Sequence, residues 1–104
     1  MNKNLTNSTT ESLYIVYLFK KDMSGFYSFD DAANYANKVI GSKPTVVNKN
    51  GVTFNVSSNS NWTWRLDYHG TFSRLPQAHI NLERWKLPFG TKGNTPLENI
   101  HLWF

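Results

Sequence analysis

Three segments in the last third of the chain, residues 61–69, 77–83 and 98–104, alternate apolar and polar residues with the period of two that is typical of a β-strand. The apolar positions are Trp62, Trp64, Leu66 and Tyr68, then Ala78, Ile80 and Leu82, and finally Ile100, Leu102 and Phe104. Successive side chains on a strand point to opposite faces of the sheet. The pattern therefore predicts a sheet with one face packed on a core and the other face polar.

The polar set of positions contains every histidine of the chain, His69, His79 and His101. The same face also receives Arg65, Asp67, Asn81 and Trp103. If the apolar sets share one core, all of these side chains meet on the opposite surface. The prediction depends on strand phase, because a slip of one residue moves a strand's whole polar set to the other face.

Residues 28–40 form the one predicted helix, since their apolar positions recur at spacings of three and four residues. Ser28 is a suitable N-cap, and Asp31 places negative charge in the first turn. Gly41 is a suitable C-terminal stop, with Pro44 just beyond it.

The rest of the chain predicts strands joined by short turns. Residues 12–19 are apolar and rich in β-branched and aromatic types, which favours a strand. Residues 45–48 and 52–56 flank an Asn-Gly pair, the strongest short signal for a hairpin. The connecting segments are a turn at 20–25 and loops at 69–76 and 84–96. The predicted fold class is α+β, with one main N-terminal helix packed on an antiparallel β-meander of about five strands.

Length and composition limit the possibilities further. A chain of 104 residues suits one domain, here predicted over residues 12–104 with a flexible polar tail at 1–11. The absence of cysteine excludes disulfides, thiolate metal sites and thiol nucleophiles. The net charge of +4 suits a polyanionic partner, although an ordinary lysine surplus explains it equally well. The longest apolar run, residues 13–19, is too short to span a membrane, and no membrane partner is expected.

The residues of the polar face suit the cleavage of RNA without a metal. That reaction needs a base for the 2′-hydroxyl, an acid for the leaving 5′-oxygen and a cation for the charge on phosphate. His79 and His101 are the predicted acid and base, in an order left open, with His69 as a third candidate and Arg65 as the cation. Asp67 or Asn81 would orient an imidazole. The predicted nucleic-acid contacts are Arg74, Arg84, Lys86 and Lys92 for phosphates and Trp103 for an unpaired base.

Other functions fit the same residues less closely. A single histidine on a strand is more often solvated or hydrogen-bonded than catalytic. His69, His79, Asp67 and His101 could supply metal ligands, but no established metal-binding motif is present, so neither metal nor cofactor is expected. The main alternative is a non-catalytic module that binds nucleic acid or protein. A third reading is a small structural or phage-encoded protein.

Three segments carry a resemblance to a known family: residues 28–38, residues 76–83 around His79, and residues 99–104 around His101. In their order along the chain they resemble the C-terminal ribonuclease domains of bacterial polymorphic and contact-dependent growth-inhibition toxins, which include a barnase/EndoU/colicin/RelE-like group. The resemblance implies a metal-independent ribonuclease toxin, often directed at tRNA, with a cognate immunity protein as partner. It also implies a secreted or delivered effector that acts in the cytoplasm of a target cell. The chain departs from the family in starting at Met1 with no delivery segment, which predicts an excised domain or a stand-alone relative.

Overall fold

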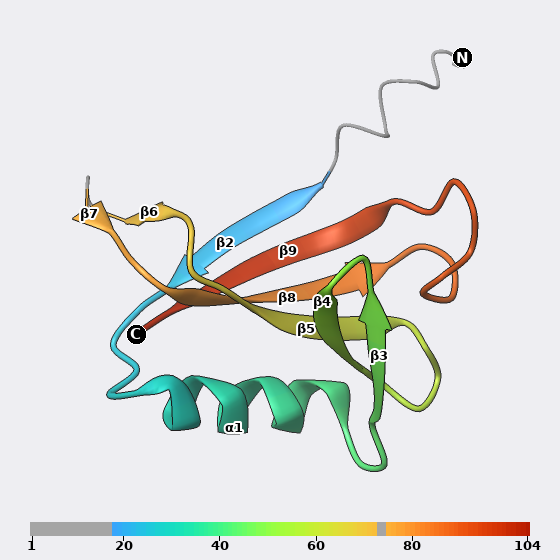
Figure 1. Cartoon of the computed structure of the whole chain (residues 1–104), viewed down its shortest axis with the longest axis horizontal. Coiled ribbons are helices and arrows are strands. Elements are labelled where there is room, and N and C mark those ends of the chain that lie inside the picture. Colours follow the sequence, from blue (N-terminus) through green and yellow to red (C-terminus); the bar gives the residue numbers. More distant parts are fainter. Residues whose placement is uncertain (1–17, 73–74) are drawn as a thin grey trace, which may run out of the picture.

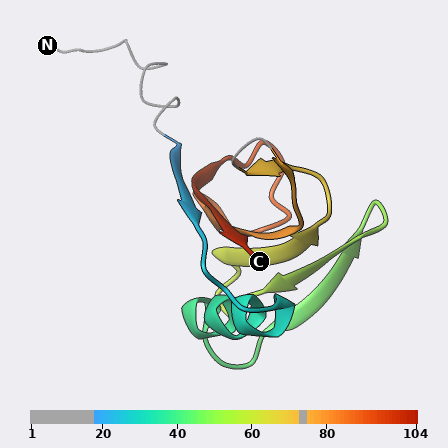
Figure 2. The same cartoon turned by 90° about the vertical axis from the view of Figure 1, so that its left-hand side faces the viewer.

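The computed structural model describes residues 18–72 and 75–104, and it has the α+β class that the sequence predicts (Figure 1). Its elements are β2 (Phe19–Met23), α1 (Phe29–Ile40), β3 (Thr45–Lys49), β4 (Val52–Val56), β5 (Trp62–Asp67), β6 (Thr71–Phe72), β7 (Leu75–Pro76), β8 (His79–Trp85) and β9 (Pro96–Trp103). Six strands form one sheet in the order β2-β9-β8-β5-β4-β3, and β6 pairs with β7 in a separate small hairpin. Figure 2 shows α1 on one side of the curved sheet and β6 on the other.

The predicted five-stranded antiparallel meander is only roughly right, because the sheet is mixed. β2 pairs with β9 in parallel, whereas the remaining neighbours are antiparallel. The turn predicted at residues 20–25 is wrong for residues 20–23, which belong to β2. These residues have no apolar pattern and form a strand through backbone pairing with β9. Of the strand predicted at residues 12–19, residues 12–17 lie outside the described part of the chain.

The predicted helix is confirmed with both of its ends. The Ser28 hydroxyl accepts a hydrogen bond from the Asp31 backbone N–H at 3.3 Å, and the Gly41 N–H donates to the Asn37 carbonyl at 3.0 Å. These contacts satisfy backbone groups that a helix end otherwise leaves unpaired. The side chains buried against the sheet are Ala32, Ala33, Ala36 and Ile40. Three alanines in that set allow the helix to lie close to the strands.

The core lies between α1 and the central strands, on the face that the apolar alternation predicts. In the strand register Leu82 lies between Trp64 and Ile100, and Ile80 lies between Leu66 and Leu102. The side chains of Ile80, Leu82 and Leu102 have no exposed surface. The predicted phase of all three strands is therefore confirmed.

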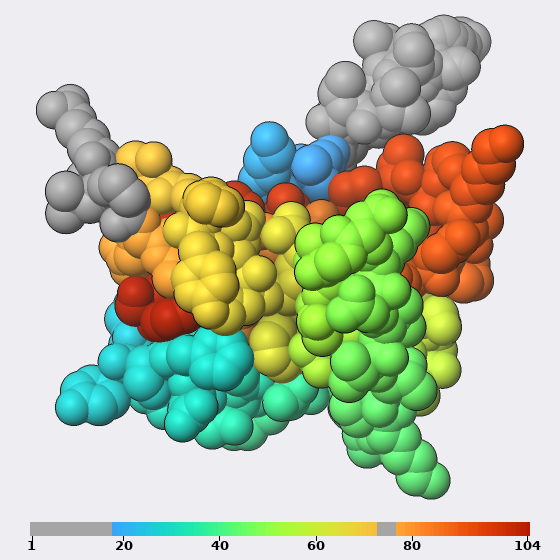
Figure 3. Space-filling model, viewed as in Figure 1, coloured from blue at the N-terminus to red at the C-terminus, as the bar shows by residue number. Residues whose placement is uncertain are grey.

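The Asn-Gly hairpin is confirmed as β3 and β4. Asn50 and Gly51 adopt φ angles of 53° and 79°, as a type I′ turn requires. Figure 3 shows this hairpin, in green, on the face of the molecule that is turned to the viewer.

The ends of β8 and β9 differ from the sequence prediction. β8 continues to Trp85 and β9 begins at Pro96, so the loop predicted at 84–96 shortens to residues 86–95. The loop predicted at 69–76 contains the β6–β7 hairpin. In the part of the chain that the structure describes, no helix has the length and apolar character needed to cross a membrane.

We expect Leu82→Ala to lower the free energy of unfolding by about 2–5 kcal/mol, because it removes a fully buried side chain and leaves a cavity. Urea denaturation followed by tryptophan fluorescence measures the change. Val46→Ala is the control, since Val46 is exposed on β3 and its loss should change the free energy by less than about 0.5 kcal/mol. Equal losses in the two variants would contradict this placement of the core.

Candidate functional site

The face of the sheet opposite α1 carries a row of polar side chains contributed by four strands. In the register, Arg65 of β5, Asn81 of β8, His101 of β9 and Asp22 of β2 lie side by side. A pocket of about 370 Å³, here named the histidine pocket, opens over the part of this row formed by Asn81, His101 and Asp22, and Arg65 lies beside it. Its lining residues are Asp22, Asp67, His69, Gly70, Thr71, His79, Asn81, Asn99, His101 and Trp103. The structure thus brings together all three histidines.

His79 and His101 form the centre of the histidine pocket. Their ring centroids lie 4.8 Å apart, with the rings tilted by 53°. His79 is only 3% exposed, because Trp103 packs on it at 4.2 Å between centroids and Gly70 closely approaches the ring. Its Nε2 lies 3.8 Å from Asp67 Oδ2, whereas its buried Nδ1 has no hydrogen-bond partner among the described residues.

The surroundings of His79 favour its neutral form. Burial lowers the pKa of His79, and repulsion from a positive charge on His101 lowers it further. The nearby Asp67 carboxylate opposes both effects without cancelling them. A neutral imidazole has a free lone pair and can accept a proton.

His101 is held by a residue that the sequence prediction missed. Its Nδ1 lies 3.2 Å from Asp22 Oδ1, and Trp103 Nε1 donates to the same oxygen at 2.9 Å. Asp22 falls in a segment predicted as a turn, and it reaches the site only because β2 pairs with β9 in parallel. No local signal in the sequence indicates that pairing.

The Asn81 side-chain amide connects His101 to Arg65. With its nitrogen toward β9, the amide donates to His101 Nε2 at 2.9 Å and to Asn99 Oδ1 at 3.1 Å, while its oxygen accepts from both Arg65 Nη atoms at 3.0 and 3.2 Å. The opposite orientation gives one longer bond, 3.3 Å to Asp67, and turns the amide N–H groups toward the guanidinium donors. We therefore adopt the first orientation, in which every polar atom of this buried amide is satisfied.

Asp67 contacts Arg65 and the His69 backbone at the end of the site opposite Asp22. Its Oδ2 lies 3.4 Å from Arg65 Nη1, and its Oδ1 accepts a hydrogen bond from the His69 backbone N–H at 2.8 Å. Burial raises the pKa of Asp67, but the His69 N–H and the charges of His79 and Arg65 outweigh that effect and hold it below its usual value. The side chain of His69 is exposed at the rim of the pocket.

The residues predicted to contact nucleic acid have different surroundings, and two of those predictions need correction. Arg84 lies in β8 and not in a loop, and its Nε and Nη2 are each 2.9 Å from Glu98 Oε2, so its charge is already paired. Trp103 is 3% exposed and stacks on Phe72 with centroids 5.2 Å apart, so its ring has no free face for a base.

The other three predicted contacts are basic loop residues. Lys86 and Lys92 are exposed in the loop after β8. Arg74 lies outside the described residues. Over residues 18–72 and 75–104, no group of three or more histidine, aspartate or glutamate side chains is arranged to hold a metal ion.

Comparison with known proteins gives one match. A family model for the MrcB-like, N-terminal domain matches residues 1–61. The chain belongs to this family. No curated protein and no solved structure matches the chain. The MrcB-like region ends before β5, so among its described residues, 18–61, Asp22 is the one that lines the histidine pocket.

We expect Gly70→Ala to destabilise the protein and to disturb His79. A Cβ at Gly70 would lie 2.7 Å from His79 Cε1 and 3.0 Å from a ring carbon of Trp103, so one of these packed rings would have to move. Overpacking of this kind costs roughly 1–3 kcal/mol. Urea denaturation and the NMR resonances of the His79 ring measure the two effects.

Gly25→Ala is the matched control for this substitution. Gly25 also has a positive φ, but a Cβ there meets nothing within 4 Å, so only backbone strain is added. An unchanged His79 resonance in Gly70→Ala would contradict the close contact.

We also expect stability to decrease as the pH falls from about 7 to about 5. His79 has a lower pKa in the folded protein than in the unfolded chain, so the unfolded chain takes up the proton first and is favoured as the pH drops through about 6.5. Urea denaturation at several pH values measures this change. His79→Leu should lose this part of the pH dependence and His69→Ala should keep it. The same slope in all three proteins would contradict the assignment to His79.

Proposed function

We propose that this protein is a metal-independent endoribonuclease that acts through the histidine pocket. The single observation that carries the proposal is the convergence of two imidazoles, 4.8 Å apart between ring centroids, with the Arg65 guanidinium joined to one of them, His101, through Asn81. An acid, a base and a cation are the groups that cleavage of RNA needs when no metal takes part. The toxin resemblance of the sequence supports the same activity.

In this mechanism His79 is the general base, because its surroundings favour the neutral form. It accepts the proton of the 2′-hydroxyl, and the resulting oxygen attacks the adjacent phosphorus. The bond from phosphorus to the 5′-oxygen breaks, and His101 donates a proton to that oxygen. The products are a 2′,3′-cyclic phosphate and a 5′-hydroxyl end. Arg65 stabilises the negative charge that develops on the phosphate.

Asp22 and Asn81 act as positioning residues for His101. Asp22 accepts from Nδ1 and thereby leaves the lone pair on Nε2, which accepts a hydrogen bond from the Asn81 amide. When His101 carries its proton on Nε2, Asn81 must turn its oxygen toward that nitrogen, and its amide nitrogen then reaches Asp67 Oδ2 at 3.3 Å.

The proposal extends to a toxin domain with RNA, in particular tRNA, as substrate and an immunity protein as partner. In that role the domain is delivered as an effector into the cytoplasm of a target cell. Its support is the resemblance in residues 28–38, 76–83 and 99–104 together with the net charge of +4. An acidic immunity protein would inhibit by covering the histidine pocket and the exposed Lys86 and Lys92.

A second function, a non-catalytic module that binds nucleic acid, is favoured by one observation. His79 is 3% exposed, Trp103 packs on its ring, and Gly70 closely approaches its Cε1 and Nδ1 atoms, so little of the ring is open to a substrate. A ring so deeply packed also suits a structural role.

Incubation of the purified protein with total RNA in EDTA separates the two functions. As a ribonuclease, the protein should cleave RNA at discrete positions, and His79→Ala and His101→Ala should each lower the rate by about 10²–10⁴-fold. Arg65→Ala should reduce the rate with the fold retained, as shown by circular dichroism. A plot of kcat/KM against pH should be bell-shaped, and its acidic limb should report His79 as the base.

Lys38→Ala is the control, because Lys38 is an exposed lysine in the last turn of α1, on the side of the sheet away from the pocket. Its rate should equal that of the unsubstituted protein. RNA that stays intact while it is bound would support the binding module instead. Cleavage that survives both histidine substitutions would refute the proposed mechanism.

A further inference from the structure

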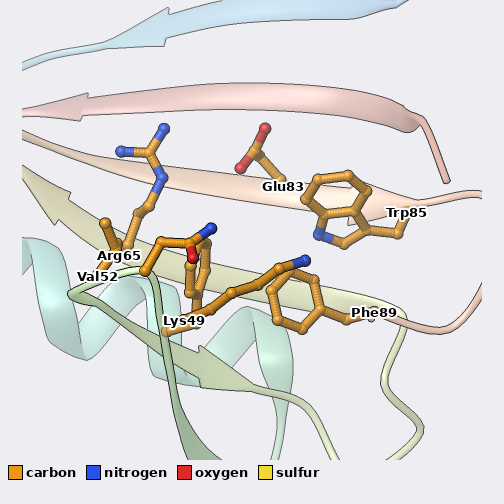
Figure 4. A pocket seen from close by; sticks show the side chains of 8 residues that line it. Lys49, Val52, Arg65, Glu83, Trp85 and Phe89 are labelled. Atoms are coloured by element: carbon orange, nitrogen blue, oxygen red, sulfur yellow. The ribbon is translucent and has the colours of Figure 1, made fainter. Parts of the chain in front are cut away.

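A second pocket lies on the same polar face of the sheet, next to the histidine pocket. Its volume is about 400 Å³, which is within the range of small-molecule sites. It is lined by Lys49, Asn50, Val52, Phe54, Arg65, Glu83, Trp85 and Phe89, and is here named the aromatic pocket. Figure 4 shows Glu83 and Trp85 projecting from one strand, Arg65 from the next, and the Lys49 side chain extending toward Phe89.

Three aromatic rings form the wall of this pocket and are held in place. Phe89 lies 4.8 Å from Phe54 and 5.6 Å from Trp85 between ring centroids. The Trp85 indole N–H donates to Thr63 Oγ1 at 2.9 Å, and the Phe89 backbone N–H donates to the Ser60 carbonyl at 2.7 Å. The rings therefore offer faces to a planar ligand without first having to become ordered.

The loop that carries Phe89 is also fixed by its own hydrogen bonds. The Asn94 side chain accepts from the Leu87 N–H at 2.9 Å and donates to the Leu87 carbonyl at 2.7 Å, and the Lys86 N–H donates to the Thr95 carbonyl at 3.0 Å. This pocket therefore has rigid walls on the sheet side and on the loop side.

Glu83 is the unusual residue of the aromatic pocket. It is 8% exposed, and its carboxyl group has neither a hydrogen-bond nor an ion-pair partner among residues 18–72 and 75–104. Burial raises the pKa of Glu83, and the positive charge of Arg65 partly opposes this. The carboxyl group lines the aromatic pocket, so it is available to accept hydrogen bonds from the N–H donors of a ligand there.

The nucleobases differ in what they can offer such a carboxylate. Guanine has two adjacent N–H donors on its Watson–Crick edge, which match the two oxygens of one carboxylate. Adenine and cytosine have an amino group next to an acceptor, and uracil has a single N–H between two carbonyl groups. A carboxylate between aromatic rings therefore selects guanine, whereas the rings alone would accept any base.

We infer that the aromatic pocket binds a guanine base, with Glu83 accepting its two N–H groups and the aromatic rings stacking on its plane. Arg65 places this base beside the histidine pocket, because the same side chain lines the aromatic pocket and bonds to Asn81 and Asp67. Along β8 the step from Asn81 to Glu83 is about 7 Å, comparable to the length of one nucleotide. In its role as a subsite for RNA cleavage, the pocket rests on the proposed ribonuclease function.

Titration of the protein with guanosine, adenosine, cytidine and uridine monophosphates by isothermal calorimetry tests the inference without any turnover. Guanosine monophosphate should bind at least ten times more tightly than the other three. Glu83→Gln should weaken its binding by about ten- to a hundred-fold, because one oxygen acceptor is replaced by a donor that faces the base. Phe89→Ala should weaken all four nucleotides together.

Glu98→Gln is the matched control, since it also removes a carboxylate but one that is paired with Arg84. It should leave guanosine monophosphate binding unchanged. Circular dichroism and urea denaturation confirm that Glu83→Gln is folded. Equal affinity for the four nucleotides, no binding, or full affinity in Glu83→Gln would overturn the inference.

The two proposals fail in different ways. Selective binding of guanosine monophosphate to a protein that leaves RNA intact would refute the ribonuclease and keep the guanine pocket. Cleavage of RNA with no preference for guanosine, and no loss in Glu83→Gln, would refute the guanine pocket and keep the ribonuclease.

Discussion

The pairing of β8 between β5 and β9 is the constraint on which the rest of the structure depends. It places Ile80 and Leu82 under α1 with no exposed surface, and it turns His79, Asn81 and Glu83 to the opposite face. Those three polar side chains are also buried. An antiparallel sheet of this kind commonly leaves one face open to water. Here the β6–β7 hairpin and the loop after β8 cover parts of that face, and the remaining openings are the two pockets.

The side chains of this buried polar row differ in whether the protein satisfies their hydrogen bonds. Asn81 satisfies its amide through Arg65, Asn99 and His101. His79 Nδ1 is buried without a hydrogen-bond partner among the described residues, whereas the Glu83 carboxyl group, which also has no protein partner there, opens on the aromatic pocket. A polar atom that is buried without a hydrogen bond lowers stability, so folding alone does not account for the burial of the His79 ring. His79 and Glu83 lie on either side of Asn81, and each lines a pocket in which a ligand can reach the row.

Much of this arrangement could be predicted from local patterns. The strict alternation around Trp64, Leu82 and Leu102 fixed which face of each strand is apolar, and that was sufficient to bring the three histidines to one surface. The helix cap at Ser28 and the Asn-Gly turn were also predicted from short sequence patterns, and both are confirmed. The burial of the polar face by other segments could not be predicted from local patterns. Trp103 and His79 were expected at an open surface, but the approach of Phe72 and Gly70 buries both, and no pattern within β8 or β9 indicates it.

The parallel pairing of β2 with β9 shows why the remaining part of the site was missed. β2 reads Phe-Lys-Lys-Asp-Met, which has no strand-like alternation, and it lies 79 residues before the histidine that Asp22 contacts. Backbone hydrogen bonds to an already formed sheet edge do not depend on side-chain pattern, so a polar segment can become a strand there. The same pairing brings Asp22 of the MrcB-like region into the histidine pocket, while the hairpin of that region supplies Lys49 and Phe54 to the aromatic pocket. Both pockets are thus completed by residues from the matched region, although the central strands that form their floors lie beyond it.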